Sequence, residues 1–232
     1  MSRLETGKRY ISSADVATLS TIYKLPVAQR EGLIEDATEG DAAGWWDRPL
    51  PGVPSEIGTI ASYEADAWRL VDWSVNLVPG LLQTYEYAVA LLRSFRVDPG
   101  DLEMRWMARL RRQQILGTVD YYAFIGEAAL RTPFGGRDAM RKQLQALAAA
   151  PDRGIPVRVL AEHCPTFLLT NSWLLMEFPN TTPVVNVEAI DGRVFLHDEP
   201  AKSYLSFVAT LDKLALSAPA SQALIRKIHE EL

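Results

Sequence analysis

The stretch Leu77-Val78-Pro79-Gly80-Leu81-Leu82-Gln83-Thr84 places a Pro-Gly pair between two apolar runs and decides where the chain turns. Pro79 fixes its own φ and drives the residue before it toward an extended conformation, whereas Gly80 can adopt φ > 0. These properties predict a sharp turn in which Gly80 is architectural, so that replacing it costs folding before function. Thr84 is a candidate N-cap for a helix over residues 84–95, where apolar side chains recur at helical spacing.

Hydrophobic periodicity predicts regular elements on both sides of this turn. Further helices are expected over residues 12–25, 27–38, 55–68, 100–116, 137–150, 200–216 and 219–231. Strands are expected over residues 69–77, 121–125, 155–160, 171–178, 183–188 and 193–196. Asp191-Gly192 is a good turn between the last two strands. The order predicts an α+β fold, with a mixed, largely antiparallel sheet and helices packed on one face of it.

Composition excludes several classes of protein. The chain has 232 residues, 48% of them hydrophobic, which is enough for a sizeable core. Its longest apolar runs fall far short of the roughly 20 residues that cross a bilayer, so we expect a cytoplasmic protein without membrane contact. The single cysteine, Cys164, excludes an internal disulfide, and three scattered histidines complete no metal site, so no metal or cofactor is expected. The net charge of -5 argues against nonspecific coating of DNA.

The predicted helix over residues 100–116 is markedly basic. Its charge comes from Arg105, Arg109, Arg111 and Arg112. Such a run is typical of a solvated helix face, and binding to an acidic partner is the alternative. In the predicted helix over residues 55–68, Glu64 shares one face with apolar side chains.

Neither of two local patterns indicates catalysis. His163 and Cys164 are neighbours, and adjacent side chains on an extended segment point to opposite faces, which argues against a nucleophile pair. The pair Gly135-Gly136 lacks the further glycines or lysine of a phosphate loop and is predicted to be a turn. No catalytic residue is therefore assigned.

Three carboxylates at or near strand ends, Glu127, Glu177 and Glu188, are expected to converge with Arg131. A carboxylate beside an arginine fits a ligand site, and it fits a structural ion pair as well. Both interpretations stay open, and the four residues are candidates for ligand binding.

The N-terminal residues Ser2-Arg3-Leu4-Glu5-Thr6-Gly7-Lys8-Arg9, followed by Asp15-Val16-Ala17-Thr18-Leu19, are similar to part of a known motif. They resemble the end of the recognition helix and the next helix of Xre-type helix-turn-helix repressors. In that family two helices and the start of the recognition helix come before this point, and bases are read by the N-terminal residues of that helix. With those helices missing, Arg3, Lys8 and Arg9 are expected to contact DNA phosphates at most, or to be solvated charges.

A second resemblance covers most of residues 44–228. It rests on an ordered set of motifs: Gly44-Trp45-Trp46, Leu77 to Thr84, Arg109 to Gln113, Glu127-Ala128-Ala129-Leu130-Arg131, Glu177-Phe178-Pro179, Val185 with Glu188, and Leu216-Ser217 with Ser221. Together these resemble the long C-terminal domain of actinobacterial, antitoxin-like regulators. The resemblance implies a transcriptional regulator, often encoded beside a small partner protein, and it implies no catalytic residues.

One region departs from that family's pattern. Where such proteins usually have a Gly-rich loop, this chain has the bulkier and more apolar segment from Ala161 to Leu169. Cys164 and Phe167 of this segment, with Trp173, are expected either to line a ligand pocket or to fill the core. A filled space beneath the segment would argue against the pocket.

The sequence divides into three predicted parts. Residues 1–38 are a truncated helix-turn-helix remnant, residues 39–58 a linker whose tryptophans dock on the main domain, and residues 59–232 an α+β domain that binds a ligand or a partner protein. A homodimer is expected, and DNA is expected as a partner only with the missing helices restored.

Two functions follow from these expectations. The first is a regulator-type protein whose C-terminal domain binds a partner protein or small ligand, with DNA binding impaired or lost. The second is a recruited protein that binds a hydrophobic small molecule, or a cofactor-free cyclase that acts on a hydrophobic metabolite in an apolar pocket.

Overall fold

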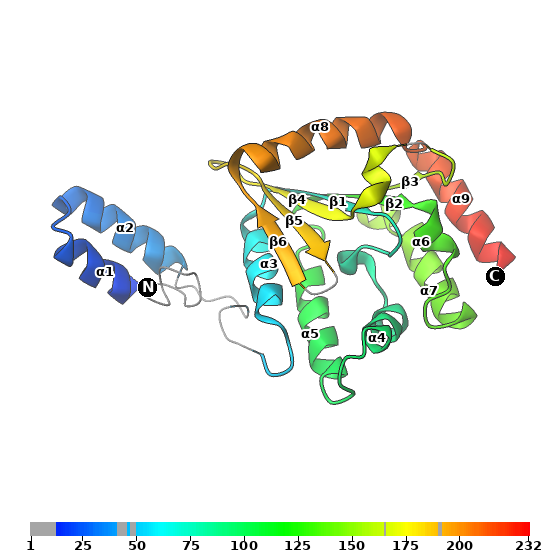
Figure 1. Cartoon of the computed structure of the whole chain (residues 1–232), viewed down its shortest axis with the longest axis horizontal. Coiled ribbons are helices and arrows are strands. Elements are labelled where there is room, and N and C mark those ends of the chain that lie inside the picture. The colour runs from blue at the N-terminus through cyan, green and yellow to red at the C-terminus, as the bar shows by residue number, and fades with distance from the viewer. Residues whose placement is uncertain (1–12, 41–45, 47–49, 165, 190–191) are drawn as a thin grey trace. The chain divides into compact units, whose positions relative to one another are not determined.

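The computed structural model describes residues 13–40, 46, 50–164, 166–189 and 192–232 (Figure 1). The chain separates into two compact units, Met1–Pro49 and Leu50–Leu232, with the division inside the predicted linker over residues 39–58. Within the described residues, no helix combines the length and the apolar character needed to span a membrane. Each unit is described by itself below.

The first unit contains two helices, α1 (Ser13–Ile22) and α2 (Val27–Gly40), as the sequence predicts. They are joined by a tight turn in which Lys24 adopts φ 54° and the Leu25 amide donates to the Ser20 carbonyl at 3.0 Å. The helical turns expected before residue 12 and the docking of Trp45 lie outside the described residues.

The second unit is built on a six-stranded mixed sheet. Its strands are β1 (Arg69–Ser74), β2 (Asp120–Gly126), β3 (Val157–Leu160), β4 (Trp173–Glu177), β5 (Val184–Ala189) and β6 (Gly192–Leu196). The order across the sheet is β3-β2-β1-β4-β5-β6. The pairs β1–β2 and β2–β3 are parallel, whereas β1–β4, β4–β5 and β5–β6 are antiparallel. The predicted mixed, largely antiparallel sheet is confirmed.

The α-helices of this unit agree with the predicted segments except for the short helix α6, which was not predicted. They are α3 (Ser55–Asp66), α4 (Tyr85–Ser94), α5 (Leu102–Gln113), α6 (Glu127–Arg131), α7 (Arg137–Ala148), α8 (Asp198–Leu214) and α9 (Ala218–Glu231). Short 3-10 helices cover Gly80–Leu82 (η2), Pro151–Arg153 (η3) and Phe167–Thr170 (η4). Ser217 caps α9, because its hydroxyl accepts from the Ala220 amide at 3.3 Å.

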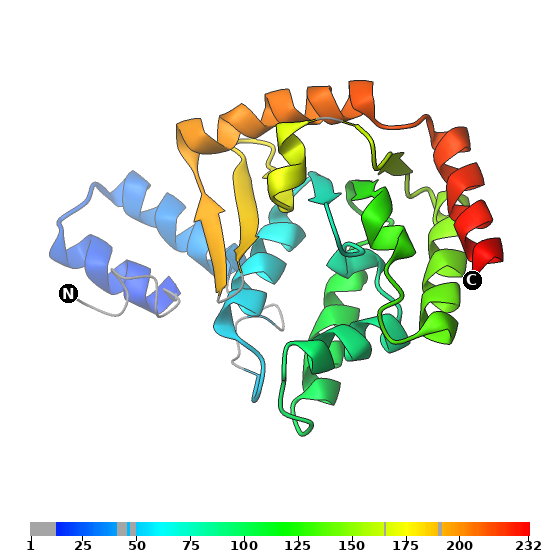
Figure 2. The ribbon, with the colours of Figure 1, turned by 45° about the vertical axis from the view of Figure 1, so that its right-hand side comes forward.

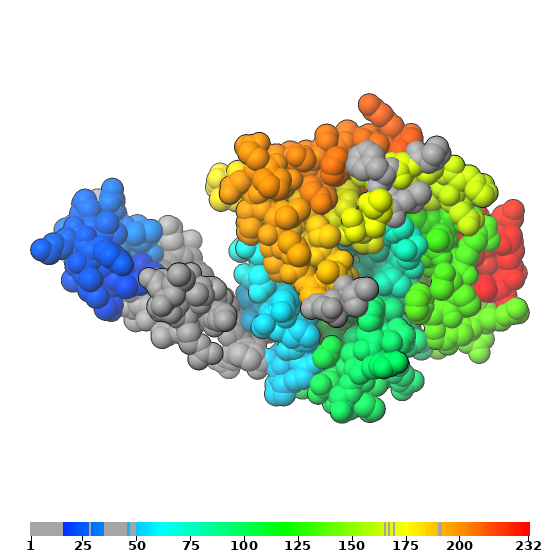
Figure 3. All heavy atoms as spheres, viewed as in Figure 1, coloured from blue at the N-terminus to red at the C-terminus, as the bar shows by residue number. Residues whose placement is uncertain are grey.

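Helices cover both faces of the sheet, so the prediction of helices on one face is wrong. Side chains alternate along a strand, and Leu70 and Val71 of β1 accordingly enter two different apolar clusters. Residues of α3, α4, α7 and α9 pack on one face, and α8 covers the other (Figures 1 and 2). In the space-filling view α8, in orange, forms the upper side of this unit (Figure 3). The strands β1 to β4 are therefore largely buried on both sides, whereas β6 at the edge of the sheet is partly exposed.

The Pro-Gly stretch forms the 3-10 helix η2, and the expected positive φ at Gly80 is not found there. Pro79 has an extended conformation, with φ -48° and ψ 137°. A Cβ added to Gly80 would meet only Nε of Arg109, at 3.9 Å. Glycine is therefore not needed here for the turn, and its absent side chain leaves room beside a guanidinium.

Side chains from three helices hold this stretch in place. The Tyr87 hydroxyl of α4 accepts from the Val78 amide at 3.2 Å, and Gln113 of α5 donates to the Gly80 carbonyl at 3.3 Å. Gln143 of α7 donates to the Leu82 carbonyl and accepts from the Thr84 amide, both at 2.8 Å. Thr84 occupies the N-cap position of α4, but its side chain makes no capping bond. The stretch is thus fixed by side chains of three helices, together with its own bond from Gln83 Nε2 to the Val78 carbonyl at 2.7 Å.

Helix α5 is also bonded to the segment that begins the second unit. Arg105 donates from Nε to the Gly52 carbonyl at 2.7 Å. The bond joins residues on α5 and upstream of α3 that lie far apart in sequence.

We predict opposite results for two Gly→Ala substitutions. Gly126, at the end of β2, lies so close to Val75 that an added Cβ would be 2.3 Å from its carbonyl oxygen. Gly126→Ala is therefore expected to lower the free energy of unfolding by more than about 2 kcal/mol. Gly80→Ala should leave it unchanged or raise it by up to about 1 kcal/mol, since alanine restricts the unfolded chain.

Urea denaturation of both variants tests this pair. A large loss of stability in Gly80→Ala would contradict this prediction and would show that Gly80 is needed for the fold, as expected from the sequence.

Candidate functional site

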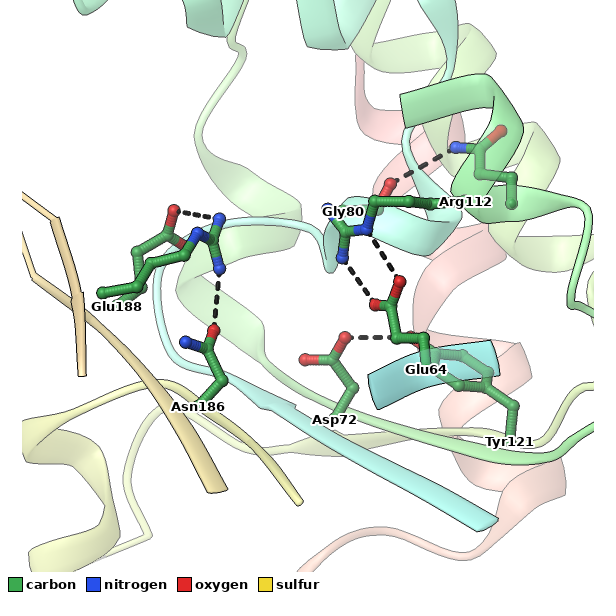
Figure 4. A network of polar contacts seen from close by, with 9 residues as sticks. Glu64, Asp72, Gly80, Arg112, Tyr121, Asn186 and Glu188 are labelled. Carbon is green, nitrogen blue, oxygen red and sulfur yellow. Dashed lines mark hydrogen bonds and ion pairs between the residues drawn. The ribbon is translucent and has the colours of Figure 1, made fainter. Parts of the chain in front are cut away.

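A network of charged and polar side chains lies inside the second unit, on the sheet face opposite α8 (Figure 4). Strands β1, β2, β5 and β6 and helices α3 and α5 supply its members. These are Glu64, Asp72, Arg109, Arg112, Tyr121, Asn186, Glu188 and Arg193, and we call this set the central polar network. The layer around this network is apolar, and it includes Leu70 of β1 and Tyr63 of α3.

The centre of this network is an ion pair between Glu64 of α3 and Arg112 of α5. Arg112 donates from Nε to Glu64 Oε2 at 2.8 Å and from Nη2 to Glu64 Oε1 at 2.6 Å. The two side chains are only 1% and 6% exposed. Burial opposes the charge on Arg112, but the charge and hydrogen bonds of Glu64 outweigh it and raise the Arg112 pKa. Arg112 therefore stays charged in a bidentate pair with the Glu64 carboxylate.

Asp72 lies in the middle of β1 and accepts a hydrogen bond from the Tyr121 hydroxyl at 3.1 Å. Burial raises the pKa of the Asp72 carboxyl to about 7, although the bond from Tyr121 opposes this, and Glu64 adds to the rise. Burial likewise raises the pKa of Tyr121 well above its ordinary value. Asp72 can therefore gain or lose a proton near neutral pH.

Arg193 of β6 joins two residues of the neighbouring strand β5. It donates from Nη1 to Asn186 Oδ1 at 2.7 Å and from Nη2 to Glu188 Oε1 at 2.8 Å. A guanidinium can only donate, so this contact fixes the orientation of the Asn186 amide. Nδ2 of Asn186 is then a buried donor without a hydrogen-bond partner among the described residues.

Arg109 differs from the other two arginines of the network. Its Nη1 is fully enclosed and has no hydrogen-bond partner, and no carboxylate among the described residues forms an ion pair with it. Burial lowers the pKa of Arg109 to about 10, and the nearby charge of Arg112 adds to this effect. The group nevertheless remains a cation at neutral pH, and no carboxylate of the described residues neutralises it directly.

Three members of the network keep part of their surface accessible. Asp72, Arg109 and Arg193 have intermediate exposure, as has Gly80 beside Arg109. Glu64, Arg112 and Asn186 are buried. A small polar molecule that reached the accessible groups would meet a carboxyl group and two guanidinium groups. The arrangement suits binding, because it contains hydrogen-bond donors and acceptors but no cysteine or histidine nucleophile.

Sequence reasoning missed most of this network. Arg109 and Arg112 were expected on a solvated face of α5, and that interpretation is wrong for both. Two signals pointed inward: Glu64 lies on the apolar face of α3, and Asp72 interrupts the apolar run of β1. Buried charges require partners, so a carboxylate on an apolar face predicts an arginine opposite it.

The predicted ligand residues do not form one site. Glu127 pairs with Arg131 at 2.7 Å within α6, and Arg131 also contacts Glu231 at 3.1 Å. Glu177 pairs instead with Arg69 at 2.9 Å. The expected convergence of three carboxylates on Arg131 is therefore wrong. Of the predicted residues, Glu188 alone belongs to the central polar network.

The apolar candidates lie on the α8 side of the sheet. Trp173 is 4% exposed, and Cys164 packs against the same cluster. The Trp73 indole donates to the Leu168 carbonyl at 2.8 Å, and Leu168 itself is 3% exposed. Phe167 begins η4, and its side chain lies outside the described part. The described side chains in this region fill core.

Two open hollows lie outside the network. One, of about 420 Å³, is lined by residues of η2, α5 and α7 that include Leu82, Trp106 and Leu110. The other, of about 460 Å³, lies beside Tyr63, Phe178 and His197. Neither contains an enclosed charge without a partner, so we place the candidate site at the central polar network.

Metal and DNA contacts gain no support from the described residues. Within them, no group of three His, Cys, Asp or Glu side chains is placed to hold a metal ion. Arg3, Lys8 and Arg9, predicted to contact DNA phosphates, lie outside the described residues, and that prediction stays untested.

The fold and the network define a class of protein, namely an α+β domain with a mixed sheet and a polar network in its interior. Some members of this network are buried and others are partly accessible. A family model described as a domain of unknown function (DUF5753) matches residues 57–227. The chain therefore belongs to the DUF5753 family. No curated protein and no solved structure matches the chain.

We predict that the Glu64–Arg112 pair is required for stability as a pair. Arg112→Met leaves Glu64 charged and buried, and it should cost about 3–5 kcal/mol of unfolding free energy. The double variant Glu64→Leu/Arg112→Met should recover most of that loss, because no uncompensated charge remains. Urea denaturation of the two single variants and the double variant measures the coupling, and purely additive losses would contradict it.

We also predict that Asp72 makes stability depend on pH. The folded carboxyl has a pKa of about 7 and its ordinary value is 3.8, so between these values the folded state holds a proton that the unfolded state has released. The free energy of unfolding should therefore fall as pH rises from about 4 to about 7. Asp72→Asn should remove this fall and be more stable than the parent protein at pH 8, by on the order of 2 kcal/mol.

Thermal unfolding across this pH range checks the effect. The exposed residue Asp152 supplies the control Asp152→Asn, which should follow the parent protein. Parallel curves for Asp72→Asn and the parent would contradict the assignment.

Proposed function

We propose that residues 50–232 form the small-ligand-binding domain of a regulator-type protein, and that the ligand binds at the central polar network. The regulator assignment rests on the resemblance of the N-terminal residues and of the ordered motifs to Xre-type regulators. The ligand assignment rests on the chemistry of the network. In this proposal the protein acts in the cytoplasm, where a regulator meets its ligand.

One observation supports ligand binding most strongly, namely that Nη1 of the Arg109 guanidinium is buried without a hydrogen-bond partner among the described residues. Taking a charge out of water costs several kcal/mol unless a partner compensates it. Arg112 and Arg193 each have such a partner, in Glu64 and Glu188. Arg109 has none among the described residues, while its neighbour Gly80 leaves room beside it. A ligand that neutralises this cation explains why the chain keeps it there.

The alternative function, binding or cyclisation of a hydrophobic metabolite, has no comparable support. It requires an apolar pocket beneath the segment from Ala161 to Leu169. In the described part of that region, Leu168, Trp73 and Trp173 occupy the space. We therefore favour a polar ligand.

Partner binding is a further part of the regulator proposal. The resemblance implies a small partner protein encoded nearby, and a homodimer is expected as well. A ligand-binding domain is a suitable element to control either contact.

The test is Arg109→Met, which replaces the cation with an apolar side chain of similar length. Without ligand, this variant should be more stable than the parent protein by about 1–2 kcal/mol, because the uncompensated charge is gone. Molecules that co-purify with the parent protein should be absent from the variant. Thermal unfolding measures the first effect, and mass spectrometry of material released by heat denaturation measures the second.

Arg112→Met on the same helix is the matched control. It should destabilise the fold, whereas Arg109→Met should stabilise it. If Arg109→Met destabilises the protein as Arg112→Met does, and no released molecule depends on Arg109, the guanidinium is structural and the proposed function is wrong.

A further inference from the structure

We infer that the hollow beside Tyr63, Phe178 and His197 is a second binding site, and that it takes a small, free quaternary ammonium ion. The described residues that line this hollow include no member of the central polar network. The inference therefore goes beyond the proposed function and does not depend on it. Three features carry it: the aromatic lining, an accessible carboxylate without a partner, and the balance of charge around the hollow.

The hollow forms where the ends of several elements meet. Its volume is about 460 Å³, and its lining comes from the last turn of α3, the connection between β4 and β5, and the residue after β6. Val185 pairs with Leu196, so the start of β5 lies beside the end of β6. The Trp68 amide donates to the Glu177 carbonyl at 3.0 Å, which holds the chain after α3 against the end of β4. One protein unit thus supplies all of these walls.

Tyr63 is the centre of a group of aromatic rings. Its ring centroid lies 6.1 Å from that of Phe178 and 6.1 Å from that of His197, with interplanar angles of 58° and 59°. Phe195 of β6 supports it, with a centroid distance of 5.5 Å. Because Phe178 and His197 are tilted against Tyr63 rather than stacked on it, the rings form walls that meet at an angle. Aromatic groups of this kind attract cations, and they suit quaternary ammonium ions in particular.

Asp66 supplies a negative charge to the same hollow. It follows Tyr63 by three residues on α3, which places both side chains on one side of the helix. The residue is exposed, so a ligand can reach it, and it has no hydrogen bond or ion pair among the described residues. Partial removal of the carboxyl group from water nevertheless raises the pKa of Asp66. A cation in the hollow would compensate this charge.

A second carboxylate lies at the edge of the hollow. Asp198 Oδ1 is 3.5 Å from the hydroxyl oxygen of Thr182, which is one of the lining residues. Among the described residues that line the hollow, none is a lysine or an arginine. An anion would therefore meet two negative charges and no compensating cation. A neutral apolar ligand would cover the Asp66 carboxylate without compensating it, which carries a cost.

The basic side chains on the adjoining strands and in the first turns of α8 are already paired with carboxylates. These pairs are Arg69–Glu177, Arg193–Glu188 and Lys202–Glu199, at 2.9, 2.8 and 2.6 Å. They add no excess positive charge, so the surroundings of the hollow stay negative. A primary ammonium group is strongly hydrated, whereas a quaternary one presents methyl groups to the rings. The lining therefore favours the quaternary ion.

The experiment uses choline as the probe of the full chain. Its uncharged analogue is dimethylbutanol, in which carbon replaces the nitrogen, so the two molecules share their shape and differ in charge. The readout is the NMR resonance of the ligand methyl groups, which ring currents shift on binding. Choline should show a saturable shift, and dimethylbutanol should bind roughly tenfold more weakly. Ethanolammonium, which lacks the methyl groups, should also bind more weakly than choline.

Four variants test the assigned contacts. Asp66→Asn keeps the size of the side chain and removes its charge, so choline affinity should fall roughly fivefold without a change in thermal stability. Asp152→Asn is the matched control, because it removes the same charge from an exposed residue of η3, and it should bind as the parent protein does. His197→Leu removes one ring and should weaken binding, whereas Tyr63→Phe keeps the ring and should not.

Phosphocholine distinguishes a free cation from a phosphate-bearing headgroup. Its phosphate would lie close to the carboxylates of the hollow, so it should bind more weakly than choline. Tighter binding of phosphocholine would overturn the assignment to a free cation.

The other failures are equally definite. Equal binding of choline and dimethylbutanol would overturn the charge of the ligand, and tighter binding of ethanolammonium would overturn its quaternary class. A methyl shift that grows linearly with protein concentration, or equal losses in Asp66→Asn and Asp152→Asn, would show that the hollow is not a site. None of these outcomes involves Arg109, so the proposed function and this inference can fail separately.

Discussion

The bidentate pair between Glu64 and Arg112 is the interaction on which the centre of the domain depends. It joins α3 to α5 over a sheet face that is otherwise apolar, and it is almost fully removed from water. An apolar pair of the same volume would give similar or greater stability. The charges instead give the interior a polar surface, on which Asp72, Arg193 and Arg109 can be accommodated. The domain thus accepts an electrostatic cost at its centre, and the proposed ligand site is where that cost is not fully compensated.

Much of the fold could be predicted from the sequence, because local patterns decide it. The Ser217 cap, the helical spacing in α4 and the antiparallel run from β4 to β6 each depend on residues that are close together in the sequence. Covering of both sheet faces could not be predicted in this way. It depends on β1 lying between β2 and β4, a pairing of segments that are far apart in the chain.

The candidate site was harder to predict for a related reason. Three arginines of α5 have the same local surroundings in the sequence, yet Arg105 holds a backbone carbonyl and Arg112 is paired, whereas Nη1 of Arg109 is buried without a hydrogen-bond partner among the described residues. Only the position of α3 and of the sheet separates these roles, and neither is readable from helical periodicity. The family motif around Gly80 did mark the right region. Glycine matters at position 80 because it leaves room beside Arg109, and not because of the backbone conformations that glycine permits.

The bond from Arg105 to the Gly52 carbonyl has a mechanical consequence. Along α5, Arg105 holds the segment that begins the second unit, Arg109 is partly accessible, and Arg112 grips α3. A helix transmits an axial shift or a rotation along its length with little internal deformation. Movement of α5 at any one of these three residues therefore also displaces the other two. The Gly52 carbonyl must then move with the helix or lose its hydrogen bond from Arg105.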